Sequence, residues 1–205
     1  MFTGIIEAIG TIEGLEEKGG DLSLTINTGK LDLADVKLGD SICTNGCCLT
    51  VVELTGQGYV ADVSVETLNV TTLSDWQLGG RVNLEKSLTP MTRMGGHMVS
   101  GHVDGIGEVI SRENSARADI FWLRVPTHLA KYVAHKGSVT VDGTSLTVNE
   151  VDGDKFCLTI VPHTLQETVI SDYQAGTKVN IEVDLIARYL ERLHMGDAAA
   201  QPSAE

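Results

Sequence analysis

The most informative feature of this chain is an internal repeat, because the sequence of its first half returns with substitutions in its second half. Residues 1–12 (MFTGIIEAIGTI) correspond to residues 98–109 (MVSGHVDGIGEV), an offset of 97 positions. Three further pairs keep that offset: 45–51 (NGCCLTV) with 142–148 (DGTSLTV), 66–68 with 163–165, and 82–85 with 179–182. A constant offset over half a chain indicates a tandem duplication, so the two halves are expected to share one fold.

The length of 205 residues then divides into two units of just under a hundred residues each. A unit of this size buries roughly 65% of its unfolded surface, which is enough for a core of its own. No apolar run approaches the ~18 residues needed to cross a bilayer, and we expect no signal peptide at the N-terminus. The net charge of −13 argues against nucleic-acid and anionic-membrane partners.

The four cysteines favour reduced thiols in the cytoplasm over a metal site or a disulfide framework. Cys43, Cys47 and Cys48 lie within six residues, and Cys157 stands alone. Adjacent cysteines are poor tetrahedral ligands, and no second pair supplies the usual zinc spacing. We therefore predict no metal and a cytoplasmic location.

Short runs with alternating apolar and polar residues predict strands. Examples are residues 22–26, 59–63, 81–85 and 179–183, and glycine-containing turns separate the runs. Many short strands with close turn signals favour an all-β barrel or sandwich in each half. A short helix is predicted over residues 127–134, after Pro126.

The end of the chain has a different period. Leucines and neighbouring apolar residues follow helical spacing at Leu185, Ile186, Tyr189, Leu190 and Leu193. An isolated helix this short is marginal in water, so its apolar stripe must pack either on its own barrel or on a partner subunit. The sequence leaves both alternatives open.

These patterns define five segments. We predict an N-terminal barrel (1–87), a linker (88–97), a C-terminal barrel (98–185), a C-terminal helix (186–196) and a disordered tail (197–205).

Equivalent positions that differ between the halves are the candidate functional residues, because the shared fold does not require the difference. The four pairs are Phe2 and Val99, Ile5 and His102, Cys48 and Ser145, and Glu66 and His163. Each residue alone has a structural interpretation: a small cysteine often fills a core, and a serine after glycine often belongs to a turn. Together they predict that two like molecules are bound in chemically different environments, as a reaction between a donor and an acceptor of the same compound requires.

Other common catalytic motifs do not compete with this interpretation. The sequence has neither of the glycine-rich phosphate-binding patterns and no H-E-x-x-H zinc motif. Residues 143–147 (GTSLT) depart from the G-x-S-x-G nucleophile elbow at the last position.

Four motifs in combination resemble the riboflavin synthase family of the alpha-chain type, which consists of duplicated lumazine-binding barrels. They are MFTGIIE at residues 1–7, NGCCLTV at 45–51, GGHMVSGH at 95–102 and DGTSLTV at 142–148. The resemblance covers residues 1–195. It implies two tandem six-stranded Greek-key β-barrels, short helices, a C-terminal helix that assembles a homotrimer, and no cofactor.

The implied reaction, the last step of riboflavin biosynthesis, is the dismutation of two 6,7-dimethyl-8-ribityllumazine molecules. One molecule transfers a four-carbon unit to the other, which gives riboflavin and 5-amino-6-ribitylamino-uracil. The resemblance places the active site between the N-terminal barrel of one subunit and the C-terminal barrel of its neighbour. It also allows association with a lumazine synthase.

The resemblance carries over site residues one by one. The catalytic candidates are Phe2, Cys48, His102, Ser145, Thr147 and Asp184. The ligand-binding candidates of the first half are Gly4, Ile5, Ile6, Cys48, Leu49, Thr50, Asp62, Val63, Ser64, Val65, Glu66 and Thr67. Those of the second half are Gly101, His102, Val103, Ser145, Leu146, Thr147, Val161, Pro162, His163, Thr164, Leu165 and Gln166, with Lys136 reaching across from the neighbouring chain.

As a mechanistic hypothesis, Cys48 and Phe2 belong to the acceptor site, and Ser145, Thr147 and His102 belong to the donor site. His102 serves as base because imidazole exchanges protons near neutral pH. Cys48 is the candidate nucleophile, and Asp184 orients one of these groups. The opposite assignment of the two sites fits the sequence equally well.

Two alternatives remain. A non-catalytic lumazine- or flavin-binding protein of the same fold is the first, and a duplicated barrel without a small ligand is the second. The thiol, imidazole and hydroxyl at positions 48, 102 and 145 favour the enzyme.

Overall fold

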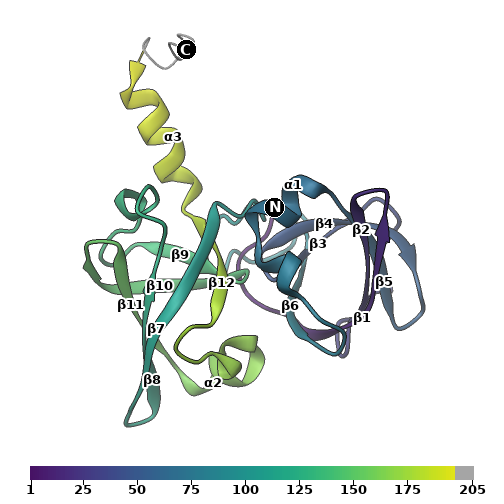
Figure 1. Ribbon diagram of the computed structural model, residues 1–205, viewed down its shortest axis with the longest axis horizontal. Helices are drawn as coiled ribbons and strands as arrows, with labels where there is room; N and C mark the ends of the chain where they lie inside the picture. Colours follow the sequence, from purple (N-terminus) through teal and green to yellow (C-terminus); the bar gives the residue numbers. More distant parts are fainter. Residues whose placement is uncertain (197–205) are drawn as a thin grey trace.

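The computed structural model describes residues 1–196 and contains two closed barrels, each with six antiparallel strands (Figure 1). The expected all-β architecture of two six-stranded barrels is confirmed. The first barrel consists of β1 (Ala8–Lys18), β2 (Asp21–Asn27), β3 (Ser41–Thr44), β4 (Cys47–Leu54), β5 (Gly58–Val63) and β6 (Arg81–Lys86). The second consists of β7 (Gly105–Ser115), β8 (Ala118–Arg124), β9 (Ser138–Val141), β10 (Thr144–Asp152), β11 (Lys155–Ile160) and β12 (Lys178–Val183).

The two barrels have the same strand order. It is β1-β2-β5-β4-β3-β6 in the first barrel and β7-β8-β11-β10-β9-β12 in the second. Strands β3, β4 and β5 follow one another by hairpins, and β2 lies beside β5, which is a Greek key. A bulge between Ile12 and Gly14 in β1 recurs between Val109 and Ser111 in β7. The irregularities of the barrels are therefore duplicated together with their strands.

Alternation along the strands builds the cores. In β2, Leu24 and Ile26 are fully buried, and the side chain of Tyr59 on β5 is also inaccessible. Burying one such side chain contributes about 2 kcal/mol. Closure of each sheet also removes the free edges that would otherwise expose backbone donors and acceptors. All four runs predicted as strands belong to β2, β5, β6 and β12.

The short helices differ in part from the sequence prediction. Residues 127–134 form only a 3-10 turn at Ala130–Tyr132, because the backbone bonds of this segment join residues three apart. Two helices that we did not predict are α1 (Val65–Val70) and its equivalent α2 (Pro162–Glu167). Their start signals are visible in the sequence: Ser64 caps α1, and Pro162 occupies the first turn of α2.

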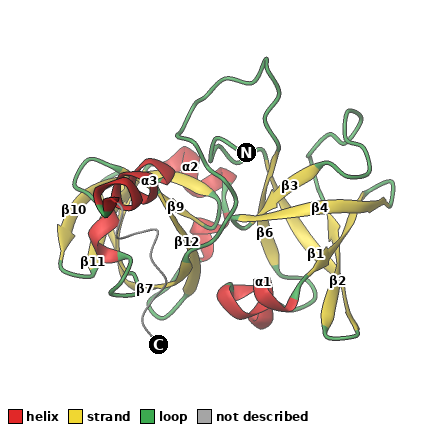
Figure 2. Ribbon diagram, turned by 90° about the horizontal axis from the view of Figure 1, so that it is seen from above, coloured by secondary structure: helices red, strands yellow, loops and turns green. Residues whose placement is uncertain are grey.

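The barrels lie side by side, with the N-terminus between them (Figure 2). At their junction the equivalent residues Phe2 and Val99 exchange two backbone hydrogen bonds, of 2.8 Å and 3.1 Å. Asn83 donates to the carbonyl of Asp142, and its equivalent Asn180 donates to the carbonyl of Asn45, both at 2.8 Å. The two barrels are thus related by an approximate twofold axis, and the equivalent residues Phe2 and Val99 meet near this axis.

Helix α3 (Leu185–His194) projects away from the C-terminal barrel (Figure 1). Its apolar residues Ile186, Tyr189, Leu190 and Leu193 are between 60% and 76% exposed. The alternative in which this stripe packs on its own barrel is therefore wrong. The tail predicted to be disordered, residues 197–205, lies outside the described residues. Within residues 1–196, no helix has the length and apolar character required to cross a bilayer.

Candidate active site

Two equivalent segments, residues 1–7 and 98–104, lie at the junction and are held by buried glutamates. The carboxylate of Glu85 accepts hydrogen bonds from the backbone of Thr3 and Gly4, at 2.6 and 2.9 Å. The carboxylate of Glu182 binds Ser100 and Gly101 in the same way, at 2.7 and 2.9 Å. Burial raises the pKa of both carboxyl groups, and these hydrogen bonds oppose part of the rise.

Each segment contacts the opposite barrel at a glycine. Cys48 donates its backbone N–H to the carbonyl of Gly101 at 2.8 Å, and Ser145 donates to the carbonyl of Gly4 at 2.8 Å. Gly101 has a φ of +77°, and a Cβ added to it would lie 2.7 Å from the Cβ of Cys48. Only glycine fits such a left-handed backbone at this close approach. Each of these contacts therefore joins one barrel to the segment that leads into the other barrel.

The first pocket has a volume of about 210 Å³ and brings together the thiol and an imidazole. Cys48 and Thr67 contribute from the first barrel, and Gly101, His102 and Val103 contribute from the second half. The sequence hypothesis grouped His102 with Ser145, whereas the structure places His102 with Cys48. The reason is the crossing of residues 98–104 to the first barrel, which no local sequence pattern reveals.

Alternation along β4 and β10 aims the matched side chains outward. Cys48 is half-buried and Thr50 is exposed, whereas Leu49 between them points into the core. On β10, Ser145 is half-buried and Thr147 is exposed, while Leu146 packs against the core of the second barrel. The period of two in a strand thus presents both candidate pairs on the outer faces of their barrels.

Ser145 belongs to a hydrogen-bonded group with His97. The Oγ of Ser145 lies 2.7 Å from Nδ1 of His97, and Nε2 of His97 lies 3.2 Å from Oγ1 of Thr140. Burial lowers the pKa of His97, and the nearby carboxylate of Asp184 opposes part of that shift. A neutral imidazole in contact with a serine hydroxyl can accept a proton.

His97 was missed as a candidate because it lies at the end of the predicted linker and has no equivalent in the first half. Its signal was the pair Gly95-Gly96 that precedes it. A Cβ on Gly96 would lie 2.2 Å from the carbonyl of Thr3 and 2.8 Å from the Cβ of Ser145. This close approach places the linker against Ser145, and the imidazole of His97 therefore lies within hydrogen-bond distance of the Ser145 hydroxyl.

Phe2 and Asp184 have structural contacts of their own. Phe2 is completely buried in a cluster with Cys43 and Val99, so its ring packs the junction and does not reach solvent. Asp184 caps α3 by accepting from the N–H of Ile186 at 2.9 Å.

The predicted binding segments 62–67 and 161–166 run into the first turns of α1 and α2, where Glu66 and His163 are exposed. Lys136 is exposed and has a φ of +62°, at the position where the first half has Gly39. A lysine in this backbone conformation is uncommon.

Accessibility distinguishes Cys48 from the other thiols of the first half. Burial raises the pKa of Cys47 to about 12 and that of Cys43 well above its usual range, so both remain protonated. All four cysteines are free thiols. Across residues 1–196, no group of three or more His, Cys, Asp or Glu side chains could hold a metal ion.

Comparisons with known proteins agree with the duplicated fold. The lumazine binding domain model matches residues 3–87 and again residues 100–184. The chain is 59% identical to riboflavin synthase of Photobacterium phosphoreum over 197 residues, which cover 96% of this chain and 90% of that protein. It is 45% identical to riboflavin synthase of Bacillus subtilis over 192 residues, 94% of this chain and 89% of that protein.

Among solved structures, LumP complexed with riboflavin has a TM-score of 0.83 at 23% identity, and the match covers 89% of this chain and 99% of LumP. LumP complexed with 6,7-dimethyl-8-(1'-D-ribityl) lumazine has a TM-score of 0.81, with the same identity and coverage. At this identity the likeness concerns the fold.

Proposed function

The chain belongs to the lumazine-binding family of riboflavin synthases, and we propose that it converts two molecules of 6,7-dimethyl-8-ribityllumazine into riboflavin and 5-amino-6-ribitylamino-uracil. The main supporting observation is the pair of equivalent sites at the junction, which carry different chemical groups. One contains the thiol of Cys48 with the imidazole of His102. The other contains the hydroxyl of Ser145 with the imidazole of His97.

The reaction needs two lumazine molecules in different roles. One must lose a proton, and the other must be electrophilic. Loss of a proton from the C7 methyl group of the donor gives a carbanion that the ring delocalises. The acceptor becomes electrophilic at C6 when a nucleophile adds at C7. Four carbons then leave the donor and join the acceptor, and the added nucleophile and the protons are returned. Two identical molecules give two products of the same total composition, so no oxidant and no net water is consumed.

We assign the donor to the Ser145 site at the junction. His97 accepts the methyl proton through or beside the Ser145 hydroxyl, because burial lowers the pKa of its imidazole and keeps it neutral near pH 7. Asp184 stabilises the imidazolium that forms. The backbone of Gly4 lies against this site, because its carbonyl accepts from the N–H of Ser145 at 2.8 Å.

We assign the acceptor to the Cys48 pocket. Cys48 is half-buried and accessible, and it adds to C7 or orients a water molecule that does so. His102 lines the same pocket and exchanges the proton of that nucleophile. This assignment moves His102 from the donor side, where the sequence hypothesis had it, to the acceptor side.

We also propose that α3 assembles the protein into a homotrimer. The exposed apolar stripe of α3 needs a partner of the same character, and a second copy supplies an identical stripe. In such an assembly the N-terminal barrel of one subunit faces the C-terminal barrel of its neighbour, and Lys136 reaches across. A cytoplasmic location fits the four free thiols. Association with a lumazine synthase is a further prediction from the family resemblance.

The second candidate is a carrier that binds lumazine or flavin without turnover, and it is favoured by the fold of LumP. One experiment separates the two. Purified protein is mixed with 6,7-dimethyl-8-ribityllumazine, and riboflavin absorbance is followed with time. Growth of the riboflavin signal with many turnovers per chain supports the enzyme. A stable spectral shift without product supports the carrier and contradicts the proposed reaction.

A further inference from the structure

Arg188, on the second turn of α3, reaches back to the segment that carries His102. Its Nη2 donates to the backbone carbonyl of His102 at 3.0 Å and to the carboxylate of Asp104 at 2.7 Å. The Asp104 side chain is 16% exposed and that of Arg188 is 29% exposed, so the ion pair is partly shielded from water. One guanidinium nitrogen thus joins the C-terminal helix to the backbone of a pocket residue.

The first half provides a reference for this contact. Asp104 accepts from the N–H of Val183 and donates its own N–H to the carbonyl of Ile181, both at 2.8 Å. At the equivalent positions, Glu7 accepts from the N–H of Lys86 at 2.8 Å and donates to the carbonyl of Leu84 at 2.9 Å. The first half therefore makes the same two bonds at this position, and among residues 1–196 no arginine is hydrogen-bonded to Glu7. The arginine is an addition of the second half, where the segment bears His102 instead of Ile5.

Stability explains only part of the contact. Arg188 compensates the partly buried carboxylate of Asp104 and opposes the rise of its pKa, but the contact also has a cost. The Nε of Arg188 is buried and has no hydrogen-bond partner among residues 1–196. An unpaired buried donor is destabilising, and Asp104 already has a backbone partner. A methionine of similar length would remove the unpaired group and keep most of the packing. The bond that stability does not account for is the second one, from Arg188 to the carbonyl of His102.

We propose that Arg188 is a positioning residue that fixes the His102 backbone relative to α3, so that the Cys48 pocket depends on the placement of this helix. The expected effect of Arg188 on the reaction rate rests on the proposed function. Residues 98–101 are already fixed by Glu182 and by the bonds to Phe2 and Cys48. Residue 102 is exposed and follows the last of these contacts. Arg188 holds the segment on the far side of His102, and the imidazole is thereby constrained from both directions.

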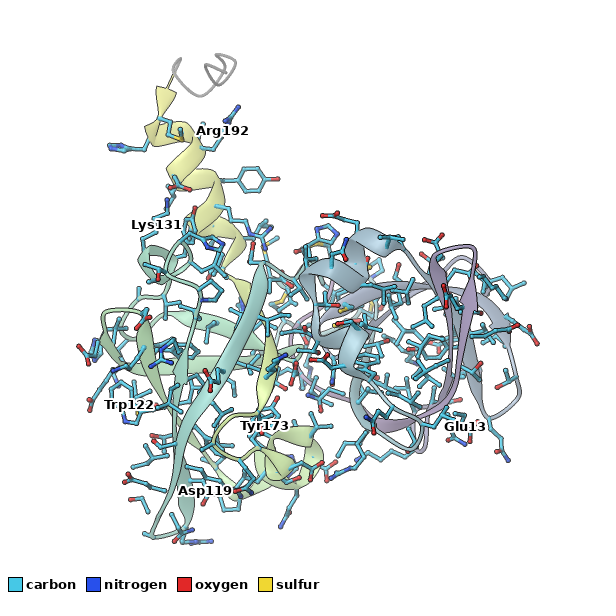
Figure 3. The ribbon with its side chains drawn as sticks, viewed as in Figure 1. Glu13, Asp119, Trp122, Lys131, Tyr173 and Arg192 are labelled. Atoms are coloured by element: carbon cyan, nitrogen blue, oxygen red, sulfur yellow. The ribbon has the colours of Figure 1, made fainter. Side chains whose placement is uncertain are left out.

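The test uses Arg188→Met with Glu191→Gln as the matched control. Glu191 lies on the same helix and binds Lys131 and the hydroxyl of Tyr132, so it also ties α3 to the C-terminal barrel. Lys131 lies beside the start of α3 (Figure 3). Among residues 1–196, no hydrogen bond or ion pair joins Glu191 to residues 98–104. A general loosening of α3 would therefore affect both variants, whereas loss of positioning would affect only Arg188→Met.

Two readouts are measured on the full-length protein. Sedimentation first confirms that the wild-type protein and both variants have the same oligomeric mass. The first is the steady-state rate: we expect kcat to fall about tenfold or more in Arg188→Met, with KM within about twofold, and little change in Glu191→Gln. The second is the NMR signal of the His102 ring, assigned by its loss in His102→Gln. This signal should shift in Arg188→Met and stay in place in Glu191→Gln.

The NMR readout is independent of turnover. If the wild-type protein forms no riboflavin, the proposed function fails, yet a shifted His102 signal still supports the positioning role. An unchanged signal in Arg188→Met, or equal changes in both variants, would overturn it. If Arg188→Met does not fold, Arg188→Lys is measured in its place. Lysine keeps the charge beside Asp104 but lacks the planar fork, so the His102 signal should again move, and an unmoved signal overturns the inference.

Discussion

Asp142 offers a sharp test of the junction, because it is a buried carboxyl at a position where the first half has an amide. Its side chain is 4% exposed. Asn180 donates its backbone N–H to one carboxyl oxygen at 2.8 Å, and the hydroxyl of Tyr173 donates to the other at 2.5 Å. Burial raises the pKa of Asp142 from 3.8 to about 7, although both hydrogen bonds oppose the rise. The equivalent residue is Asn45, whose Oδ1 accepts from the N–H of Asn83 at 2.6 Å.

The sign of the pH effect follows from this raised pKa. Between pH 4 and pH 7 the folded protein keeps the proton that the unfolded chain has lost, so the free energy of unfolding falls as pH rises through this window. One pKa unit corresponds to about 1.4 kcal/mol, which gives a ceiling of about 4 kcal/mol for a pKa raised from 3.8 to about 7. Relaxation of the interior reduces this cost, and we expect about 2 kcal/mol.

Asp142→Asn should therefore raise the free energy of unfolding by about 2 kcal/mol at pH 8 and by less than about 1 kcal/mol at pH 5. The amide keeps the acceptor for Asn180 and can donate to the hydroxyl of Tyr173. Asn45, at a φ of +44°, shows that an asparagine fits the equivalent backbone, since Asp142 has a φ of +42°. Chemical unfolding followed by tryptophan fluorescence, at one protein concentration and both pH values, measures the change.

The reciprocal variant is the control. Asn45→Asp creates a buried carboxyl beside Trp76, which occupies the position of Tyr173 and supplies no hydroxyl, so this variant should lose stability at pH 8 and recover it near pH 4. If Asp142→Asn unfolds at the same or lower denaturant concentration than the wild-type protein at pH 8, a costly ionised carboxyl at the junction is refuted.

Three further outcomes are expected. Cys48→Ala should keep ligand binding, measured by fluorescence titration, and lose most steady-state turnover; near-normal rates would remove the thiol from the mechanism. Leu190→Asp should lower the oligomer mass in sedimentation, because it places a charge in the exposed stripe of α3, and an unchanged mass would refute assembly through this helix. Gly101→Ala should cost about 1–3 kcal/mol of stability and weaken binding in the Cys48 pocket, whereas Gly153→Ala, also at positive φ but in open space, should leave binding unchanged.

Much of the architecture could be read from the sequence. A period of two predicted the strands that became β2, β5, β6 and β12, and the constant offset of 97 predicted that both halves have one fold. Helical spacing after Leu185 predicted α3. These features depend on local periodicity or on self-comparison, which a single sequence contains. The 3-10 turn at Ala130–Tyr132 was predicted as a helix because composition over eight residues does not decide between the two.

The composition of the pockets was beyond the sequence. Comparison of the halves identified Cys48, Ser145 and His102 as unequal positions, and it assigned each residue to the pocket of its own half. The structure instead places His102 in the pocket of Cys48 and brings His97 from the linker onto Ser145.

The sequence therefore determined the duplicated barrel, and it identified the equivalent positions at which the two halves carry different side chains. Only the tertiary structure decided which of these groups meet. The physical reason is that residues 1–7 and 98–104 each contact the opposite barrel. Gly4 accepts a backbone hydrogen bond from Ser145, and Gly101 accepts one from Cys48. Such contacts join residues about fifty to one hundred and forty positions apart, and no local pattern of polarity encodes them.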